Sequence, residues 1–456
     1  MKTFSDFKDF GKKIQKKFVL RPILLIALSF FIVIVIGSIL LYMPFSLQEG
    51  VEISYINALF TATTATCVTG LVDLPLGIGN TFSIAGQIII LLLIQLGGLG
   101  VTVVGTLFVV LILGKVTLGQ QMLIKETWNL SSAKVVKKVF FYTLLITLIV
   151  EILGAVLSFI SFYCIHEMEV GTAVKNAFFH SISSFNNAGI DLLGTTSLIS
   201  TNDPLLLTVT SFLIIVGGLG YIVIVNIVSK KFNLKKLSLH SKIVLVMTSV
   251  LIVTGAGLIF LTSYSDGVFM ISFENSVFLS VSSRTAGFTT VDLSTVPSAT
   301  NIVLIFLMFI GASPGGTGGG VKTTTIFVII SYIVSIFKNK QPCAFKRQIG
   351  QDNVKKALLI FIISFSFILI ASLSITIIED FVGNPLSYES VLFESTSAFA
   401  TVGLTTGITT SLSVGSRVIL IIMMYLGRLG PMSIASILKS NNIQTWHYVE
   451  ENVPIG

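Results

Sequence analysis

Charged residues are scarce in this sequence. Asp, Glu, Lys and Arg make up 11% of the 456 residues and hydrophobic residues make up 53%, whereas a soluble globular protein carries about 25% charged residues. This deficit excludes an ordinary water-soluble domain and predicts a chain embedded in lipid. Eight apolar stretches, most of them long enough for a ~30 Å hydrocarbon core, are the expected spanning helices. Six are continuous, namely 23–41, 88–113, 139–162, 205–228, 243–261 and 357–378, and two, 302–337 and 418–438, are interrupted by Gly, Pro, Lys or Arg.

Cysteine is also rare, and the residues that bind metals or catalyse reactions are not grouped. The three cysteines, Cys67, Cys164 and Cys343, lie far apart, which argues against a disulfide framework and a cysteine metal site. A P-loop needs Lys directly after its second Gly, but Val321 separates Gly320 from Lys322. We therefore expect that the chain is not an enzyme and binds no nucleotide itself.

The basic residues, which give a formal net charge of +8, lie in alternate connections between the expected spans. They precede the first span and fill the second, fourth and sixth connections, whereas the other connections are acidic. The positive-inside rule makes the basic face cytoplasmic, so we expect a multi-pass protein of the cell membrane with both termini in the cytoplasm. Attraction to anionic membrane lipid accounts for the charge without nucleic acid.

The acidic connections contain a repeated pattern. The four copies are NALFTATTATCVTGL at 57–71, NAFFHSISSFNNAGI at 176–190, NSVFLSVSSRTAGF at 275–288 and SVLFESTSAFATVGL at 390–404. In each copy a Phe opens a run rich in Ser, Thr and Ala that ends at a Gly, and a patch of small residues follows inside the next span. Such self-similarity indicates repeats. Because each copy contains two spans, all four enter the membrane from the same side.

The predicted fold is therefore an all-α polytopic membrane protein with four parallel, pseudo-symmetric helix–pore loop–helix repeats around one central pore. The expected divisions are 1–113 for the N-terminus and repeat 1, 114–228 for repeat 2, 229–337 for repeat 3, 338–438 for repeat 4 and 439–456 for a short tail.

Four such re-entrant segments have the properties of a cation filter. Non-helical backbone at membrane depth is tolerated only inside protein or along a water-filled cavity. Each Ser/Thr/Ala-rich run can form a short pore helix whose C-terminus carries partial negative charge, and the extended residues that follow can offer carbonyl oxygens in place of an ion's water. The candidate potassium-binding residues are Thr66, Cys67, Val68, Thr69 and Gly70; Asn186, Asn187, Ala188 and Gly189; Arg284, Thr285, Ala286 and Gly287; and Thr401, Val402 and Gly403.

A glycine-rich segment at 311–325 interrupts the sixth expected span and is the candidate gate. Its glycines and proline cannot hold a continuous helix, so we interpret it as a movable plug beneath the filter; a passive kink is the alternative. Arg428, in the eighth span, would repel cations there, or it would pair with Glu394 or a helix C-terminus. Glu151 in the third span is expected to hydrogen-bond across helices rather than to bind ions. The candidate gate residues are Gly311, Pro314, Gly315, Gly316, Thr317, Gly318, Gly319, Gly320, Lys322 and Arg428.

The motifs CVTGL, FNNAGI, RTAGF and ATVGL, in that order, resemble the four selectivity filters of the Ktr/Trk/HKT superfamily of potassium transporters. The resemblance covers 21–438 and is closest to the bacterial Ktr membrane subunit, of the KtrB or KtrD type. In plant relatives a Ser at the first filter Gly goes with sodium transport, so Gly70 implies potassium selectivity. The intramembrane loop and Arg428 match the gate of the family.

The resemblance also implies partners. We expect a homodimer that sits on a cytosolic ring of RCK-type nucleotide-binding subunits, of the KtrA or KtrC type, with sodium dependence left open. Two other functions stay open: a sodium-selective or non-selective cation transporter of the same fold, and, more distantly, a secondary carrier of an organic solute.

Overall fold

The computed structural model describes residues 22–100, 133–194, 198, 203–265 and 267–430. Within these residues the protein is mostly helical, which confirms the predicted all-α class. The helices are α2 (Pro22–Tyr42), α3 (Tyr55–Cys67), α4 (Gly77–Thr81), α5 (Ile84–Gly98), α8 (Ala133–Ile160), α9 (Val170–Phe185), α10 (Pro204–Leu219), α11 (Tyr221–Ser229), α12 (Leu239–Thr262), α13 (Phe273–Ser282), α14 (Ser298–Phe309), α15 (Thr323–Phe337), α16 (Gln351–Val382), α17 (Tyr388–Ala400) and α18 (Val414–Leu429).

Short elements connect these helices. The helical turns are η1 (Pro44–Ser46), the π-helical η2 (Ser161–Ile165), η3 (Leu234–Lys236) and η4 (Thr409–Ser411). Two antiparallel strand pairs are β1 (Tyr264–Ser265) with β2 (Val268–Phe269), and β3 (Cys343–Ala344) with β4 (Arg347–Gln348).

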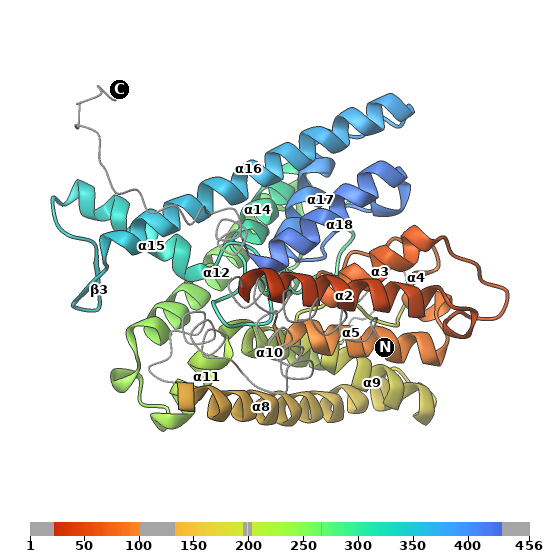
Figure 1. Ribbon diagram of the computed structural model, residues 1–456, viewed down its shortest axis with the longest axis horizontal. Coiled ribbons are helices and arrows are strands. Elements are labelled where there is room, and N and C mark those ends of the chain that lie inside the picture. Colours follow the sequence, from red (N-terminus) through yellow and green to blue (C-terminus); the bar gives the residue numbers. More distant parts are fainter. Residues whose placement is uncertain (1–21, 101–132, 195–197, 199–202, 266, 431–456) are drawn as a thin grey trace, which may run out of the picture.

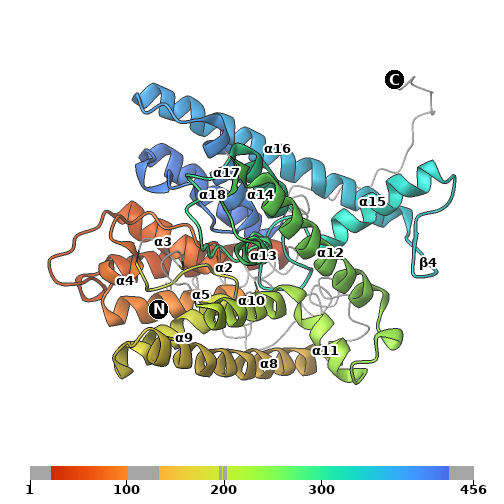
Figure 2. The same ribbon diagram turned by 180° about the vertical axis from the view of Figure 1, so that it is seen from behind.

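The described chain consists of four successive units, each with a first apolar helix, a short buried helix and a second apolar helix or broken helix. The buried helices are α3, α9, α13 and α17, and Figures 1 and 2 show the units following one another around the molecule. The second helix of each unit packs against the buried helix of the next, as α5 on α9, α10 on α13 and α14 on α17. Because α18 packs on α3, the four units close into a ring.

Several helices are long and apolar enough to cross a membrane. Among the described residues these are Tyr142–Ile165, Leu239–Thr262 and Gln351–Val382, and the bent pair α10 and α11 forms a fourth candidate. Shorter apolar helices include Ala27–Tyr42 and Ile84–Gly98. Large apolar side chains such as Leu148 on α8 and Ile362 on α16 are exposed, as expected of surfaces covered by lipid. The protein is therefore a multi-pass membrane protein.

One of the expected continuous spans is wrong in detail. The stretch 205–228 is not one helix, because α10 and α11 meet at a bend of 92°. Gly220, at the bend, has a φ of +91°, and a Cβ there would lie 2.7 Å from the carbonyl oxygen of Pro314. The expected span 88–113 is described only as far as Gly100: α5 ends at Gly98, Gly100 has a φ of +92°, and the remainder of the span lies outside the described residues. The small-residue patches thus end helices where the chain must turn around its neighbours.

Some predictions concern residues outside the described ranges. These are the N-terminal part of repeat 1 before residue 22, the end of repeat 1 at 101–113, the start of repeat 2 before residue 133, and everything after residue 430, including the tail 439–456.

Three of the four short buried helices, α3, α13 and α17, begin at a side-chain cap, and all four contain small side chains; α9 begins at Glu169 without a side-chain cap. The Ser54 hydroxyl caps α3, with Asn57 completing a capping box, and Ser272 and Ser387 cap α13 and α17 in the same way without the box. The Phe that opens each repeated pattern, at positions 60, 179, 278 and 393, is buried. Small Ser, Thr and Ala side chains on these helices allow close approach to their neighbours.

An ion pair joins the last unit to the first on the side of the buried-helix N-termini. Arg417 Nη1 lies 3.2 Å from Asp73 Oδ2, and Asn57 Nδ2 donates to the same oxygen at 3.0 Å. The Asp73 side chain is 1% exposed. Burial raises the pKa of Asp73 to about 6, although Arg417 and Asn57 act to lower it. On the opposite flank, the Tyr425 hydroxyl donates to the carbonyl oxygen of Ala27 at 2.7 Å.

Replacing Arg417 by Met should destabilise the protein in a pH-dependent way. The folded protein binds the Asp73 proton more tightly than the unfolded chain, so the contribution of Asp73 to stability is present at low pH and is lost as pH rises through about 6. At pH 8 the charged carboxylate of the variant has no cationic partner and keeps only the hydrogen bond from Asn57, and we expect a loss of about 3 kcal/mol in the free energy of unfolding. At pH 5 the loss should be much smaller.

Thermal unfolding in detergent at both pH values measures this difference, and Asp73→Asn in the Arg417→Met background should restore most of the loss at pH 8. Equal unfolding temperatures for the wild type and Arg417→Met at pH 8 would show that the pair does not hold the ring together.

Candidate ion-binding site

The four glycines that end the repeated patterns have the same backbone setting. Gly70, Gly189, Gly287 and Gly403 all have positive φ angles, between +63° and +100°. Two residues before each glycine a non-glycine residue adopts the left-handed conformation: Val68, Asn187, Thr285 and Thr401. In the first, second and fourth copies the same number of residues separates the Phe from the Gly. The third copy has one residue fewer and still adopts this geometry. The short helices therefore all end in the same turn.

These glycines approach the neighbouring units in cyclic order. A Cβ on Gly70 would lie 2.6 Å from the carbonyl oxygen of Ala188, and one on Gly189 would lie 2.4 Å from that of Ala286. One on Gly287 would lie 2.4 Å from the carbonyl oxygen of Val402, and one on Gly403 would lie 2.1 Å from that of Thr69. Only hydrogen fits at these four positions, so the four segments meet around one centre.

Hydroxyl groups on the short helices support the segments from behind. The Thr64 and Ser397 hydroxyls accept from the backbone N–H groups of Gly70 and Gly403, each at 3.0 Å. Ser183 accepts from Ile190 N at 3.0 Å, and Ser282 donates to the carbonyl oxygen of Phe288. The sequence analysis missed these residues, although a Ser or Thr stands five or six positions before every one of the four glycines.

Most side chains of the candidate filter residues point away from the centre. Cys67, Val68, Ala188, Ala286 and Val402 belong to hydrophobic clusters behind the segments. Such burial leaves the backbone as the part of these segments that can line the centre. The hydroxyls of Thr66 and Thr69 have no hydrogen-bond partner within the described structure.

Two candidate residues are turned toward surrounding helices. The Arg284 guanidinium donates to the carbonyl and hydroxyl oxygens of Thr248 on α12, each at 3.4 Å. The Asn186 amide donates to Glu151 on α8 at 2.9 Å and to Gln95 on α5 at 3.2 Å. The expectation that Glu151 hydrogen-bonds across helices is therefore confirmed, and its partner Asn186 is a candidate filter residue.

The glycine-rich segment between α14 and α15 lies directly against the ends of the short helices. The N–H of Gly319 donates to the Thr401 hydroxyl at 2.9 Å, and a Cβ on Gly318 would lie 1.8 Å from the Thr285 hydroxyl oxygen. The Thr317 hydroxyl donates to the carbonyl oxygen of Phe185, the last residue of α9, at 3.5 Å. This segment therefore lies against three of the four units beneath the turns.

The same segment is also anchored to the bend between α10 and α11. Ser313 N donates to the carbonyl oxygen of Gly218 at 3.1 Å, and Tyr221 N donates to that of Gly315 at 3.0 Å. Within the segment, Gly316 N donates to the carbonyl oxygen of Ser313 at 3.1 Å. At the base of the segment, Gly311 N donates to Val321 O at 2.9 Å. Next to Val321, Gly320 has a φ of +68°.

Two cations, the buried Arg428 and the half-buried Lys322, hold this segment through backbone carbonyl groups. Lys322 Nζ donates to the carbonyl oxygens of Gly318 at 2.7 Å and Gly319 at 3.2 Å. The Arg428 guanidinium donates to the carbonyl oxygens of Thr317 and of Gly97, near the C-terminus of α5.

The proposed pairing of Arg428 with Glu394 is therefore wrong, whereas its contact with a helix C-terminus is present. The Glu394 carboxylate instead accepts hydrogen bonds from the hydroxyls of Thr405 and Thr409.

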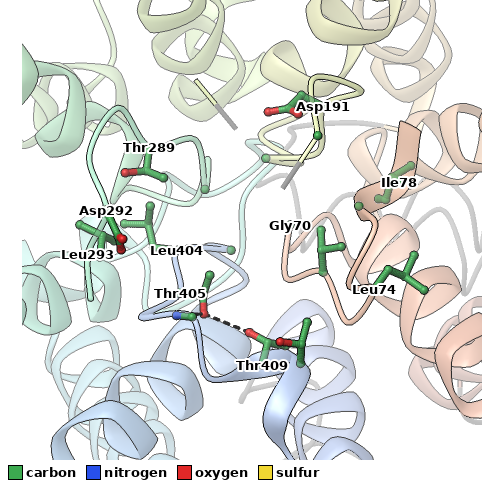
Figure 3. Close-up of a pocket in the computed structure, with 18 of the residues that line it drawn as sticks. Gly70, Leu74, Ile78, Asp191, Thr289, Asp292, Leu293, Leu404, Thr405 and Thr409 are labelled. Atoms are coloured by element: carbon green, nitrogen blue, oxygen red, sulfur yellow. Dashed lines mark hydrogen bonds between the residues drawn. The ribbon is translucent and has the colours of Figure 1, made fainter. Parts of the chain in front are cut away.

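On the other side of the glycines lies a cavity of about 540 Å³. All four filter glycines line it, together with Asp191, Asp292 and several threonines. Figure 3 shows the two aspartates on different segments around this space, with Thr405 and Thr409 on the side opposite Asp191. Carboxylates at the mouth of a cleft raise the local concentration of cations, so the cavity is suited to collect them above the ring.

Comparison with known proteins places these features in a family. Residues 12–444 match the family model TrkH, described as a cation transport protein. The chain is similar to the potassium/sodium uptake protein NtpJ of Enterococcus hirae, with 36% identity over 98% of this chain and 99% of that protein. It is also similar to the Ktr system potassium uptake protein B of Vibrio alginolyticus, with 35% identity over 95% of this chain and 94% of that protein.

Among solved structures, the fold is similar to that of the potassium transporter TrkH from Vibrio parahaemolyticus. The TM-score is 0.68 and the identity is 18%, over 91% of this chain and 84% of that chain.

Proposed function

Because this chain belongs to the TrkH family of cation transport proteins and is a potassium uptake transporter, we propose that potassium ions pass through the ring formed by Gly70, Gly189, Gly287 and Gly403. The cyclic close approach of these four glycines is the observation that carries the proposal. The proposed architecture is the one that the sequence predicts: four parallel, pseudo-symmetric repeats around one pore, with the predicted divisions.

The backbone of the four segments supplies the chemistry of ion selection in this proposal. A dehydrated potassium ion needs several oxygen ligands in place of its water. Carbonyl groups of the four segments can supply them, since the side chains of Val68, Ala188, Ala286 and Val402 pack outward. The C-termini of four short helices add partial negative charge nearby. No covalent chemistry is involved, in agreement with a family of transporters rather than enzymes.

Sodium is the alternative substrate. One relative is named a potassium/sodium uptake protein, so a sodium-selective or non-selective transporter of the same fold, or a sodium-dependent potassium transporter, is the competing proposal. Glycine at all four ring positions supports potassium as the preferred ion. Inward movement needs no further energy source, because the membrane potential is worth about 2.3 kcal/mol per charge for each 100 mV.

The segment 311–325 is the proposed gate. Its position against Thr285 and Thr401 places backbone directly in line with the turns of the filter segments. Arg428 adds a positive charge at the same level and holds Thr317. Conduction would require this segment to move away from the ring, and the bend at Gly220 would have to release Gly315.

Relatives named as parts of a Ktr system imply a regulatory subunit in that system. For this chain we propose a homodimer on a cytosolic RCK-type ring. Exposed lysines lie at the tip of α11, at positions 230, 231, 235 and 236, and the β3–β4 hairpin carries further basic residues. Figure 1 shows α11 and this hairpin at the same end of the molecule. That end is the proposed cytoplasmic face, with both termini on it.

Uptake of rubidium-86 as a potassium tracer by the reconstituted full-length chain tests the function directly. The proposal is supported if excess potassium abolishes rubidium uptake and excess sodium does not. Equal competition by sodium and potassium favours the non-selective alternative. If neither rubidium nor sodium is taken up, both the proposal and that alternative are wrong.

The ring predicts a difference between two alanine substitutions. Gly403→Ala places a methyl group 2.1 Å from Thr69 O, whereas Gly407→Ala meets nothing within 4 Å, although the φ angles of the two glycines are similar, at +94° and +90°. A clash of this kind costs about 1–3 kcal/mol, so we expect Gly403→Ala to reduce selective rubidium uptake about tenfold or more. Gly407→Ala is the control for backbone strain and should retain most of the uptake. Equal effects of the two changes would remove the ring from the ion path.

The gate predicts increased flux when its anchors are lost. Deleting residues 315–319 should raise rubidium uptake, because backbone leaves the space beneath the ring. Lys322→Gln, a smaller change, removes the charged donor to Gly318 and Gly319. We expect about tenfold more flux from it, as the loss of roughly 1.4 kcal/mol of closing energy implies. Lys338→Gln, at an exposed lysine just after α15, is the matched control. Unchanged or lower flux in both gate variants, at normal protein levels, would favour the passive kink.

A further inference from the structure

A carboxylate that has no cationic partner among the described residues lies inside the membrane region next to the second candidate filter segment. Glu151 stands in the middle of α8, between apolar neighbours, and is 9% exposed. A charged side chain at such a place is costly and marks a functional role by default. The proposed ion path and gate do not use Glu151, so its position needs another explanation.

Glu151 shares the amide nitrogen of Asn186 with two other acceptors. Asn186 Nδ2 lies 2.9 Å from Glu151 Oε1, 3.2 Å from Gln95 Oε1 and 2.8 Å from the carbonyl oxygen of Ile182. These acceptors belong to α8, α5 and α9, so one amide group is held by three helices from two units. A further contact anchors α8, because the Ser181 hydroxyl donates to the carbonyl oxygen of Glu151 at 2.6 Å.

The Asn186 side chain packs tightly against Gly98 on α5. A Cβ on Gly98 would lie 1.8 Å from Asn186 Oδ1, so the side chain fits only because α5 carries a glycine there. Asn186 directly follows α9, and the next residue, Asn187, adopts the left-handed conformation that starts the second filter segment. Any shift of the Asn186 side chain therefore acts on the turn that sets the position of Ala188.

The Ala188 carbonyl oxygen is the one that a Cβ on Gly70 would strike. The position three residues before the ring glycine differs among the units: it is Asn186 in the second, Arg284 in the third, Cys67 in the first and Ala400 in the fourth. Only the second and third are tied by hydrogen bonds to the first helix of their own unit, through Glu151 and Thr248. The hydrogen bond in the second unit is shorter than that in the third, and its acceptor is the carboxylate of Glu151.

We propose that Glu151 is a positioning residue for ion selection, which holds Asn186 and thereby fixes the second filter segment beside Gly70. This inference rests on the proposed function of the ring. Carbonyl-based discrimination between potassium and sodium depends on the spacing and number of the oxygen ligands. Loosening one of four segments should therefore lower selectivity before it lowers the amount of folded protein.

Two substitutions at Glu151 separate the hydrogen bond from the charge and the volume. Glu151→Met keeps the volume and removes the acceptor, whereas Glu151→Gln keeps an acceptor oxygen for Asn186 and removes the charge. We expect Glu151→Met to reduce the preference for rubidium over sodium about tenfold in reconstituted full-length protein, and Glu151→Gln to restore most of that preference. Thr143→Val is the control on the same helix, because the Thr143 hydroxyl has no hydrogen-bond partner within the described structure.

A double substitution tests whether Glu151 acts through Asn186. If it does, Glu151→Met should have little further effect on selectivity in an Asn186→Ala background. Full additivity of the two changes, or wild-type selectivity of Glu151→Met at normal protein levels, would overturn the positioning role. An unselective wild type would instead contradict the proposed potassium selectivity, so the two failures are distinguishable.

Discussion

The close approach of four irregular backbone segments is the constraint on which the rest of the structure depends. Each segment leaves a short helix, turns through a left-handed residue and passes a neighbour so closely that only glycine fits. Backbone of this kind within a membrane must be enclosed by protein or line a water-filled space. The ring of helix contacts encloses it, and the hydroxyls of Thr64, Ser183, Ser282 and Ser397 satisfy polar groups that the turns leave open.

The same constraint explains the glycine patches at the ends of the second helices. A Cβ on Gly97 would lie 2.0 Å from the carbonyl oxygen of Thr66, and one on Gly217 would lie 1.9 Å from that of Phe185. The patches therefore let neighbouring helices touch the ends of the short helices. At the end of α10, the carbonyl oxygens of Gly217 and Gly218 accept from the backbone of the glycine-rich segment of the third unit. Arg428, Lys322 and Glu151 make hydrogen bonds at this level to neutral groups, so each charge serves to hold a neutral partner in place.

Much of the molecule was predictable because its signals are local. Scarce charge and apolar runs predict a helical membrane protein, and the Phe-to-Gly pattern, repeated four times, marks the segments that the structure brings together. Their role in ion conduction stays a prediction. Other features were not predictable in detail. The bend at Gly220 lies within an unbroken apolar run, and the partner of Arg428 on α5 stands 331 positions away in the chain.

The sequence by itself determined the class of protein, the four Phe-to-Gly segments and the glycine-rich segment, because helix propensity, hydrophobic length and the need for glycine are properties of short stretches. Only the tertiary structure decided the cyclic order of contacts, the neutral partners of Arg428 and Glu151, and the outward orientation of Arg284. These depend on which helices lie side by side, and hydrogen bonds between distant segments form only after the packing of apolar and small residues has chosen the neighbours.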